Sequence, residues 1–409
     1  MPANISRKGL TDLNLPYIVE YSKAEQTTLV QKSGNRKVLL VTLYGNYNYG
    51  NILQRLALTS VIEPLGFEVT HLCIVTPPPK QPASRIIKTF IKNAIKRVLA
   101  LLGVQKYRTQ FRSMEMLPTI VPAFTKYQEQ HIPSTSRIYM TFQESLSADS
   151  SEWTSYDYAV TGSDQVWHNW SRTPEELEYY YLSFMPPEKR VCYAPSFGFS
   201  EFPESYYAFH KKGLAGFERL SCREQEMIPM IQSISGKDAQ LVLDPTLLLK
   251  ASQWRAFASK PEYDVPERFV LCYFLGSKIP EYQSAIRQAA GDLPVINIYD
   301  PSDKKHWNTD PGGFLWLFDH ADFVCTDSFH GTAFSVNFGK NFIVFRRKQT
   351  GMEDMFGRIS GLLGSLDITG HICEHGMKVR PEPVNYDEVY AKLDALRESS
   401  MQYLRDCLK

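Results

Sequence analysis

The sequence predicts an α/β protein of two domains with parallel sheets. Its 409 residues exceed what one hydrophobic core ordinarily organises, so two domains are expected. Several apolar runs lack alternation with polar residues, which is typical of strands buried on both faces of a parallel sheet. Segments with helical periodicity follow these runs, and this alternation of strand and helix favours the α/β class.

The first unit of this pattern follows a polar, irregular lead-in over residues 1–36. Residues 37–43 form a continuous apolar run that predicts a buried strand. A helix should begin near Asn51 and stop at Gly66, and residues 67–72 predict the next strand. This order is that of a βαβ unit.

The same pattern returns later in the chain. Further strands are expected at 156–162, 190–194, 269–276, 295–298 and 321–326. Helices are expected at 280–291, after residue 326, and at 385–408. The segment Asp244-Pro245-Thr246 separates the two groups of units, so we expect the domain junction near 235–260.

Composition and charge exclude several classes of protein. The net charge of +1 does not indicate a nucleic-acid partner. The seven cysteines include no Cys-x-x-Cys pair, so neither a zinc site nor a disulfide framework is predicted. No signal core is evident near the N-terminus, and no run reaches the roughly 18 apolar residues of a membrane span. We therefore expect a cytoplasmic protein, which can still touch a membrane surface.

A strand-to-helix turn at 45–54 is the first candidate ligand site. Its glycines let the backbone approach a ligand, and amide groups at a helix start favour anions. The turn has neither the spacing of the dinucleotide fingerprint nor the Gly-Lys-Ser/Thr of a phosphate loop. A turn that only connects two elements fits these residues equally well.

A second turn, at 161–167, also follows a strand of the buried type. Ligands of open α/β sheets lie at the carboxyl ends of strands. Asp164 can accept a proton from a hydroxyl group there, and Gln165 can orient one. In the alternative interpretation, which spacing alone favours, Asp164 caps the next helix and Trp167 packs in the core.

Arg223 and His330 are the remaining candidates for chemistry. A guanidinium group at a strand end can bind a carboxylate or phosphate, although an ion pair from Arg223 to Glu224 or Glu226 is the alternative. In the segment 326–332, TDSFHGT, helix amides and hydroxyl groups can hold a phosphate, and His330 can donate a proton near neutral pH. A lone histidine is more often structural, but its Ser, Gly and Thr neighbours at a turn make this one a better candidate.

The segment 80–112 is basic and amphipathic. Residues 69–114 contain nine Lys or Arg and no acidic residue. One helical stripe is apolar and another carries Lys88, Lys92 and Lys96. These features predict a helix that lies on anionic lipid, while a helix packed on the core with a solvated basic face is the alternative.

Six segments in this order resemble the polysaccharide pyruvyl transferase family. They cover most of the chain between about residues 38 and 365. The matching segments are YGNYNYGNILQ at 44–54, GSDQVW at 162–167, YAPSFG at 193–198, SCRE at 221–224, LDPTLL at 243–248 and TDSFHGT at 326–332.

The resemblance implies two Rossmann-like domains that face each other across a cleft, as in GT-B glycosyltransferases. It divides the chain into the lead-in at 1–36, an acceptor-side domain at 37–235, a donor-side domain at 236–380 and a C-terminal helix at 381–409. It also implies transfer of pyruvate from phosphoenolpyruvate to two hydroxyl groups of a sugar, which forms a cyclic ketal. The acceptor would be a surface polysaccharide or its lipid-linked precursor, and no metal or cofactor is expected.

The resemblance suggests roles for the candidate residues. His330 would act as the acid or as a phosphate ligand, Arg223 would hold the donor, and Asp164 would orient or deprotonate the acceptor. Some members of the family have arginine where this chain has Ser328, so Arg223, Arg358 or the helix start after Gly331 must meet the donor's charge. The expected donor-binding residues are Arg223, Ser328, His330, Gly331, Thr332 and Arg358, and the expected acceptor-binding residues are Asn48, Gly50, Gln54, Asp164 and Gln165.

Two other functions remain open at this point. A glycosyltransferase that uses a nucleotide-sugar would have the same fold and would bind a nucleoside diphosphate. A non-catalytic member of a polysaccharide biosynthesis cluster would bind neighbouring enzymes without turnover. The presence of both Arg223 and His330 weighs against the non-catalytic alternative.

Overall fold

The computed structural model describes most of the chain. The described residues are 36–45, 47–75, 92, 94–133, 136–141, 144, 153–168, 174–199, 204–276, 278–347, 356–373 and 381–409. The predicted lead-in, apart from Arg36, lies outside the described residues, and so do residues 80–91 of the basic segment.

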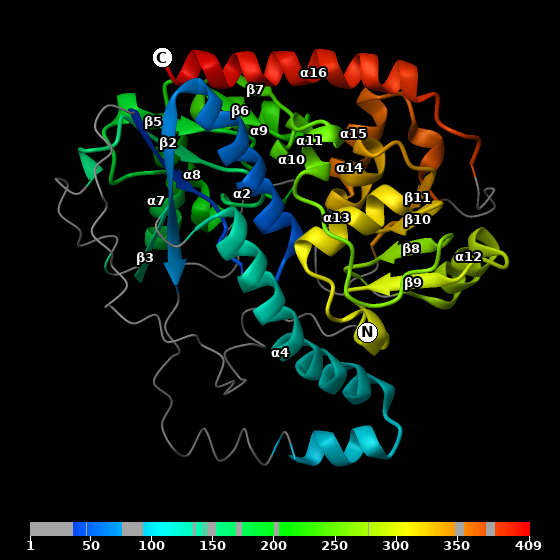
Figure 1. Ribbon diagram of the computed structural model, residues 1–409. Coiled ribbons are helices and arrows are strands. Elements are labelled where there is room, and N and C mark those ends of the chain that lie inside the picture. The colour runs from blue at the N-terminus through cyan, green and yellow to red at the C-terminus, as the bar shows by residue number, and fades with distance from the viewer. Residues whose placement is uncertain are drawn as a thin grey trace.

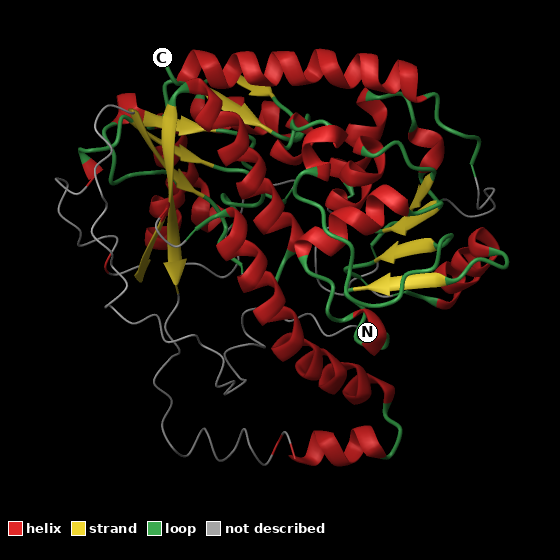
Figure 2. Ribbon diagram, viewed as in Figure 1, coloured by secondary structure: helices red, strands yellow, loops and turns green. Residues whose placement is uncertain are grey.

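The N-terminal half contains a five-stranded sheet in which all neighbouring strands run parallel (Figure 2). Its residues from Val38 to Val41 are buried, as expected of an apolar run without alternation. The strands in sheet order are β3 (Arg137–Thr141), β2 (Phe67–Val75), β1 (Arg36–Val41), β4 (Tyr158–Thr161) and β5 (Arg190–Cys192).

The C-terminal half contains a four-stranded parallel sheet, and a two-stranded parallel sheet is formed by residues between the two. Ser221 of the small sheet donates from its hydroxyl group to the carbonyl of Cys192, which places this pair beside β5. The four strands in sheet order are β11 (Phe342–Val344), β10 (Phe323–Thr326), β8 (Val270–Tyr273) and β9 (Val295–Ile298), and the pair is β6 (Leu220–Cys222) and β7 (Ala239–Leu241).

Helices cover the sheets and connect them (Figure 1). The α-helices are α2 (Tyr49–Ile62), α4 (Gln105–His131), α7 (Pro174–Tyr180), α8 (Tyr207–Ala215), α9 (Met227–Ser235), α10 (Pro245–Leu248), α11 (Ala251–Arg255), α12 (Pro280–Ala290), α13 (Pro311–His320), α14 (Phe329–Asn337), α15 (Gly357–Ser365) and α16 (Tyr386–Cys407). The short 3₁₀ helices are η2 (Glu63–Leu65), η4 (Pro187–Lys189), η5 (Glu204–Tyr206), η6 (Lys304–His306) and η7 (Thr369–His371).

The two halves share an apolar core. Tyr49 on α2 stacks on Phe314 of α13 with 4.4 Å between ring centroids, and its hydroxyl donates to the carbonyl of Thr309 at 2.7 Å. The C-terminal helix α16 spans both halves, as the red helix of Figure 1 shows. Near its start Tyr390 donates to the carbonyl of Asn337, and near its end Tyr403 donates to the carbonyl of Cys192. The chain is therefore an α/β protein of two Rossmann-like halves held together by helices.

The boundaries of the first helix differ by a few residues from those predicted. The helix expected to begin near Asn51 begins at Tyr49, because Asn48 is its N-cap and accepts a hydrogen bond from the amide of Asn51 at 3.2 Å. It also ends at Ile62 rather than at Gly66, where η2 intervenes before Gly66 turns the chain at a φ of 92°.

The 27-residue helix α4 was not predicted. Pro118 and Pro122 lie inside it, and proline normally ends a helix in a sequence pattern. Its C-terminal half packs into the core through Phe124 and Tyr127, and this tertiary burial keeps the chain helical. In the part of the chain that the structure describes, no helix is long and apolar enough to cross a membrane.

Candidate active site

The carboxyl ends of the two large sheets face each other at the start of α2. A Cβ atom added at Gly50 would lie 2.3 Å from two ring atoms of His330, so the first turn of α2 packs against the imidazole of α14. His330 follows β10 of the C-terminal sheet, whereas α2 follows β1 of the N-terminal sheet. The absence of a side chain at Gly50 therefore lets the two halves meet at His330.

Arg223 is at the centre of a buried charged cluster. Its guanidinium group contacts three carboxylates, those of Asp244 at 2.6 Å, Asp164 at 3.3 Å and Glu224 at 3.4 Å. The side chain is 2% exposed and lies 4.9 Å from the ring centroid of Phe329. The expected ion pair with Glu224 is present, but it is one of three, and all three guanidinium nitrogens are engaged. Arg223 thus organises three carboxylates, and its role as a clamp on the donor stays a prediction.

Asp244 is the site residue that the sequence did not reveal. One carboxylate oxygen accepts from the amide and hydroxyl of Thr246, at 3.0 and 2.7 Å, and caps α10. The other accepts from Arg223 and from the hydroxyl of Ser163, and it lies 3.9 Å from Nε2 of His330. An Asp-Pro-Thr sequence signals the helix cap, but nothing in it indicates the contacts of the second oxygen.

Burial and neighbouring charges shift the pKa values in this cluster in opposite directions. Burial alone would raise the pKa of Asp244, but Arg223, His330 and the bonds from Thr246 lower it to about 2. Burial opposes the charge of Arg223, yet Glu224, Asp244 and Asp164 raise its pKa. Both groups are therefore charged across the physiological pH range.

The imidazole of His330 has a lowered pKa. Burial is the largest cause, and Arg223 and Arg358 act in the same direction, while Asp244 and Asp164 oppose them. Its Nε2 atom is buried and has no hydrogen-bond partner among the described residues. A neutral imidazole is thus favoured near pH 7, and an anion bound beside Nε2 would raise its pKa.

The start of α14 differs from its predicted form. The helix begins at Phe329 rather than after Gly331, with Ser328 as its N-cap. The amide of Gly331 donates to the hydroxyl of Ser328 at 3.4 Å, and the amide of Thr332 donates to its carbonyl at 2.9 Å. A Cβ atom at Gly331 would lie 2.2 Å from Oγ1 of Thr326, so this glycine permits close packing on β10. The hydrogen-bonding groups of Ser328, Gly331 and Thr332 thus complete the first turn of α14. The backbone amides of its first two residues have no acceptor within the helix.

Only some of the residues predicted to bind the acceptor lie next to Arg223 and His330. Asp164 has a φ of 66° and faces Arg223, and among the described residues it makes no helix-capping bond. Trp167 is fully buried, as the alternative interpretation expected. Gln54 is buried. Its side-chain nitrogen donates to Oγ1 of Thr42, and its side-chain oxygen accepts from the backbone amide of Ser163. Gln54 therefore fixes the ends of β1 and β4.

Asn48 and Gln165 are likewise placed beside the cluster and not at its centre. Asn48 caps α2, as described above. The side-chain nitrogen of Gln165 lies 2.2 Å from where a Cβ atom of Gly198 would stand, so Gln165 packs against the loop after β5. Of the predicted acceptor-side residues, Asp164 and Gly50 are those that the structure brings next to Arg223 and His330.

Two further arginines border the cluster on its more exposed side. Arg358 on α15 lies 3.8 Å from both Asp164 and Glu224, with a side chain 12% exposed. Burial and Arg223 lower its pKa to about 10, so it keeps its charge at neutral pH. Arg347, which the sequence did not single out, lies 3.8 Å from Asp327 with a side chain 23% exposed, and its Nε atom has no hydrogen-bond partner among the described residues.

Asp327 has a structural role in the same turn. Its two carboxylate oxygens accept from the amides of Leu275 and Gly276, both at 2.7 Å, and so tie the loop after β8 to the loop after β10. Burial raises its pKa, which Arg347 and these amides partly offset. Within the described residues, no group of three or more His, Cys, Asp or Glu is placed to hold a metal ion.

Comparisons with known proteins found a matching family model and distantly similar solved structures. A family model described as polysaccharide pyruvyl transferase matches residues 48–349. Among solved structures, an Anabaena protein, HepE, in complex with UDP and glucose is similar at a TM-score of 0.45 and 11% identity, covering 90% of this chain and 95% of that one. Staphylococcus aureus MnaA in complex with UDP is similar at a TM-score of 0.43 and 10% identity, covering 91% of each chain. No curated protein matches the sequence.

Proposed function

The chain belongs to the polysaccharide pyruvyl transferase family, and from this premise we propose that it transfers pyruvate from phosphoenolpyruvate to two hydroxyl groups of a sugar. The observation that carries this proposal is the contact of His330 with a cluster of three carboxylates and two arginines at the junction of the two halves. Such a cluster combines groups that transfer protons with groups that bind anions.

Ketal formation requires the uptake of a proton at C3 of the donor and the loss of a proton from each of two sugar hydroxyl groups. A proton added to C3 of phosphoenolpyruvate makes C2 electrophilic, and one sugar hydroxyl loses its proton as its oxygen bonds to C2. A second hydroxyl then bonds to C2 while the C2–O bond to phosphate breaks. Of the two hydroxyl protons, one balances the proton taken up at C3 and the other leaves with inorganic phosphate.

His330 is the group best placed to carry the proton to C3. Three carboxylates face Arg223 and Arg358, so one positive charge is missing from the cluster, and a protonated His330 would supply it. Burial lowers the pKa of His330, but the carboxylate and phosphate of a bound donor would raise it. We therefore expect the donor to bind together with uptake of a proton.

Arg358 and Arg347 are the proposed ligands of the donor's phosphate. They are more exposed than Arg223, and the guanidinium fork suits phosphate oxygens. They would provide the positive charge that relatives with arginine at the position of Ser328 supply from that residue. Arg223 then acts as a positioning residue that holds Asp164, Glu224 and Asp244.

Asp164 is the proposed base for the sugar hydroxyl. It comes from the N-terminal half, opposite His330, so acid and base approach the donor from different halves of the molecule. Its carboxylate is held by Arg223 at 3.3 Å and Arg358 at 3.8 Å. The acceptor is a sugar of a surface polysaccharide or of its lipid-linked precursor.

The test measures phosphate release from phosphoenolpyruvate with galactose- or mannosamine-containing acceptors, and mass spectrometry detects the ketal product. His330→Gln should lower kcat by about a hundredfold or more, as expected for loss of a general acid. Arg358→Gln should mainly raise KM for phosphoenolpyruvate. Arg268→Gln is the matched control. Arg268 precedes β8 and makes an exposed ion pair with Asp322, at the end of the strands opposite the candidate site.

Binding provides an independent measurement. Phosphoenolpyruvate should stabilise the wild-type protein against heat, and its affinity should increase as the pH falls from about 8 to about 6, since His330 takes up a proton. The His330→Gln protein should lose this pH dependence. Stabilisation by UDP-sugars but not by phosphoenolpyruvate would contradict the proposal and support a glycosyltransferase.

A further inference from the structure

The exposed apolar side chains of this protein are concentrated in one segment. Among the described residues, seven large hydrophobic side chains are exposed, and five of them lie between residues 95 and 104. Leu101 and Leu102 are 82% and 75% exposed. Scattered exposed leucines are common on soluble surfaces, whereas a contiguous group marks an interaction surface. The five are Ile95, Val98, Leu101, Leu102 and Val104.

Three of these side chains share one side of a short helix. Residues 94–101 are helical, and Ile95, Val98 and Leu102 follow the spacing that places side chains on one stripe. The helix ends in a turn at Gly103, where φ is 96° and the amide of Val104 donates to the carbonyl of Leu99. Leu101 and Leu102 lie at this end of the helix. We call Lys92 and residues 94–104 the tip segment.

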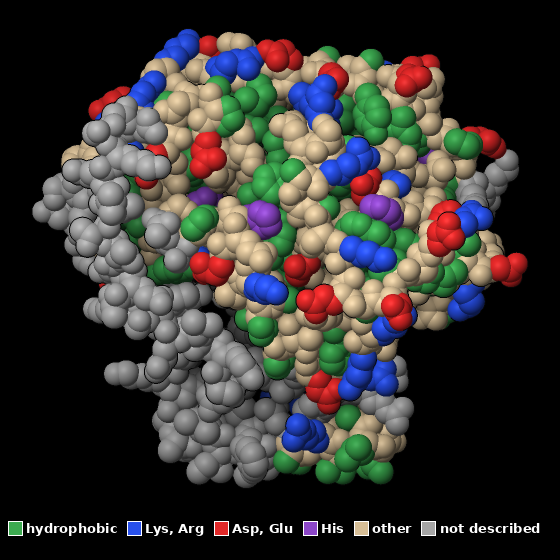
Figure 3. Space-filling model, in the orientation of Figure 1, with side chains coloured by type: hydrophobic (Ala, Val, Ile, Leu, Met, Phe, Trp, Pro, Cys, Tyr) green, Lys and Arg blue, Asp and Glu red, His purple; other side chains and the backbone are tan. Residues whose placement is uncertain are grey.

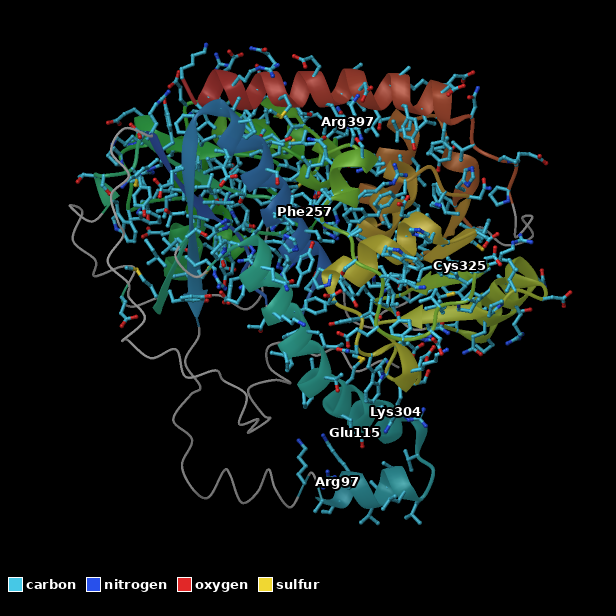
Figure 4. All side chains as sticks on the ribbon, in the orientation of Figure 1. Arg97, Glu115, Phe257, Lys304, Cys325 and Arg397 are labelled. Atoms are coloured by element: carbon cyan, nitrogen blue, oxygen red, sulfur yellow. The ribbon has the colours of Figure 1, made fainter. Side chains whose placement is uncertain are left out.

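The tip segment lies away from the rest of the described molecule. Figure 1 shows it below the body, joined through α4, and Figure 4 places Arg97 on it. In Figure 3 hydrophobic and basic side chains lie side by side at this end of the molecule. Helix α4 is fixed to the C-terminal half by the ion pair of Glu115 with Lys304, at 3.1 Å. The tip segment is thus held out from the body.

The charge of the segment identifies the surface it fits. Lys92 and Arg97 are exposed beside the apolar stripe, and residues 69–114 contain no acidic residue. A helix that presents both apolar and basic side chains on its exposed surface lies in the interface of an anionic bilayer, where both contributions are favourable. A twofold pairing with a second copy would bring two basic segments together, which like-charge repulsion opposes.

We propose that the tip segment docks on the surface of an anionic lipid bilayer, with Leu101 and Leu102 inserted between headgroups. The core-packed alternative for the basic segment is contradicted in its described part, because Ile95 and Val98 are exposed. Docking does not depend on the transferase reaction. It would hold the candidate active site at a fixed distance from the membrane, which suits an acceptor carried on a lipid.

Vesicle sedimentation of the full-length protein tests the docking. Two vesicle compositions are compared, phosphatidylcholine alone and equal parts of phosphatidylcholine and phosphatidylglycerol. The protein should bind the anionic vesicles at least about tenfold more tightly, and raised salt should weaken this binding. Equal binding to both vesicles, or binding to neither, would overturn the proposal.

Two pairs of substitutions separate the apolar from the electrostatic contribution. The double variant Leu101→Gln and Leu102→Gln should lower binding to anionic vesicles about tenfold. The variant Lys92→Glu and Arg97→Glu should lower it by about fivefold or more for each residue. The matched controls are Leu241→Gln on β7 and Lys211→Glu on α8, both exposed residues distant in sequence from the tip segment, which should bind as the wild type does.

Two readouts keep the outcomes distinct. Light scattering that shows a dimer which the leucine variant dissociates would overturn the proposal in favour of a second copy. Pyruvyl transfer to a soluble acceptor is measured on the same proteins, so loss of vesicle binding with full transfer isolates docking from the proposed function. Vesicle binding by a protein without transferase activity would in turn contradict only the proposed function.

Discussion

The molecule has two groups of basic side chains that differ in their surroundings. Arg223, Arg347 and Arg358 lie among carboxylates where the two sheets meet, and their side chains are between 2% and 23% exposed. Lys92 and Arg97 of the tip segment are exposed, in a stretch without any acidic residue. The first group is held by buried ion pairs, whereas the second lies on the exposed surface of the tip segment.

The difference shows that position, more than charge, determines what a basic residue contributes. A buried guanidinium needs carboxylate partners to offset the loss of hydration, and the pairs then hold their members in one geometry. Exposed basic groups contribute little to folding and remain available to an external anionic surface. The first arrangement suits catalysis and the second suits docking. Four measurements test this difference between the buried cluster and the tip segment.

The largest effect is expected from removing the central arginine. Arg223→Met leaves the carboxylate of Asp244 buried without its strongest partner, so the free energy of unfolding should fall by about 3–5 kcal/mol. In the control Arg268→Met the lost pair with Asp322 has an arginine 70% exposed, and the change should be below about 1 kcal/mol. Urea denaturation followed by circular dichroism measures both. Similar losses in the two variants would remove the distinction between buried and exposed arginines.

A smaller effect on stability, with a large effect on activity, is expected at Gly50. In Gly50→Ala the new methyl group would lie 2.3 Å from the ring of His330, so the ring must move, at a cost of about 1–3 kcal/mol. Pyruvyl transfer should fall at least about tenfold because His330 would be displaced. Gly361→Ala on α15 is the control: no atom lies within 4 Å of the added Cβ, and alanine in a helix should raise stability by about 0.5–1 kcal/mol. Full activity in Gly50→Ala would refute the close contact.

The third measurement concerns the pH dependence of stability. Burial lowers the pKa of His330 in the folded protein, so below the ordinary histidine pKa of about 6.5 the unfolded chain binds the extra proton. The neutral imidazole of His330 is therefore compatible with folding above that pH. As the pH falls, keeping it unprotonated in the folded protein increasingly lowers the stability. The free energy of unfolding of wild type minus that of His330→Gln should drop between about pH 8 and about pH 5. A difference that stays constant or rises would show that the imidazole is charged in the folded protein.

The smallest effect is expected in the tip segment. Arg97→Gln changes an exposed side chain, so the free energy of unfolding should change by less than about 0.5 kcal/mol. The same variant should still lose affinity for anionic vesicles. A stability loss close to that of Arg223→Met would mean that the tip segment contributes to the fold as the buried cluster does.

Much of the fold follows from local patterns. The run KVLLVTL at 37–43 has no polar alternation, so it had to be buried on both faces, and β1 is. The strand expected at 295–298 coincides with β9. Helix α4 could not be predicted in this way, because its internal prolines are compensated only by burial against the other half of the molecule.

The candidate site was predicted less completely. Asp164, Arg223, His330 and Arg358 were named from the sequence and do lie together. Asp244 and Arg347 were not predicted as site residues, since their part in the cluster depends on contacts between segments far apart in the chain. For Gln54, Ser328, Gly331 and Thr332 the structure shows contacts within the chain that complete turns and strand ends, and their role in ligand binding stays a prediction.

The sequence by itself determined the α/β class, the family and the turns where chemistry is expected, because periodicity and turn residues act over a few neighbouring positions. Only the tertiary structure decided which charges meet, that three carboxylates engage Arg223, and that Gly50 admits His330. It also decided that the apolar side of the tip segment is exposed. Burial and ion pairing depend on distances between segments remote in the chain, which no local pattern encodes.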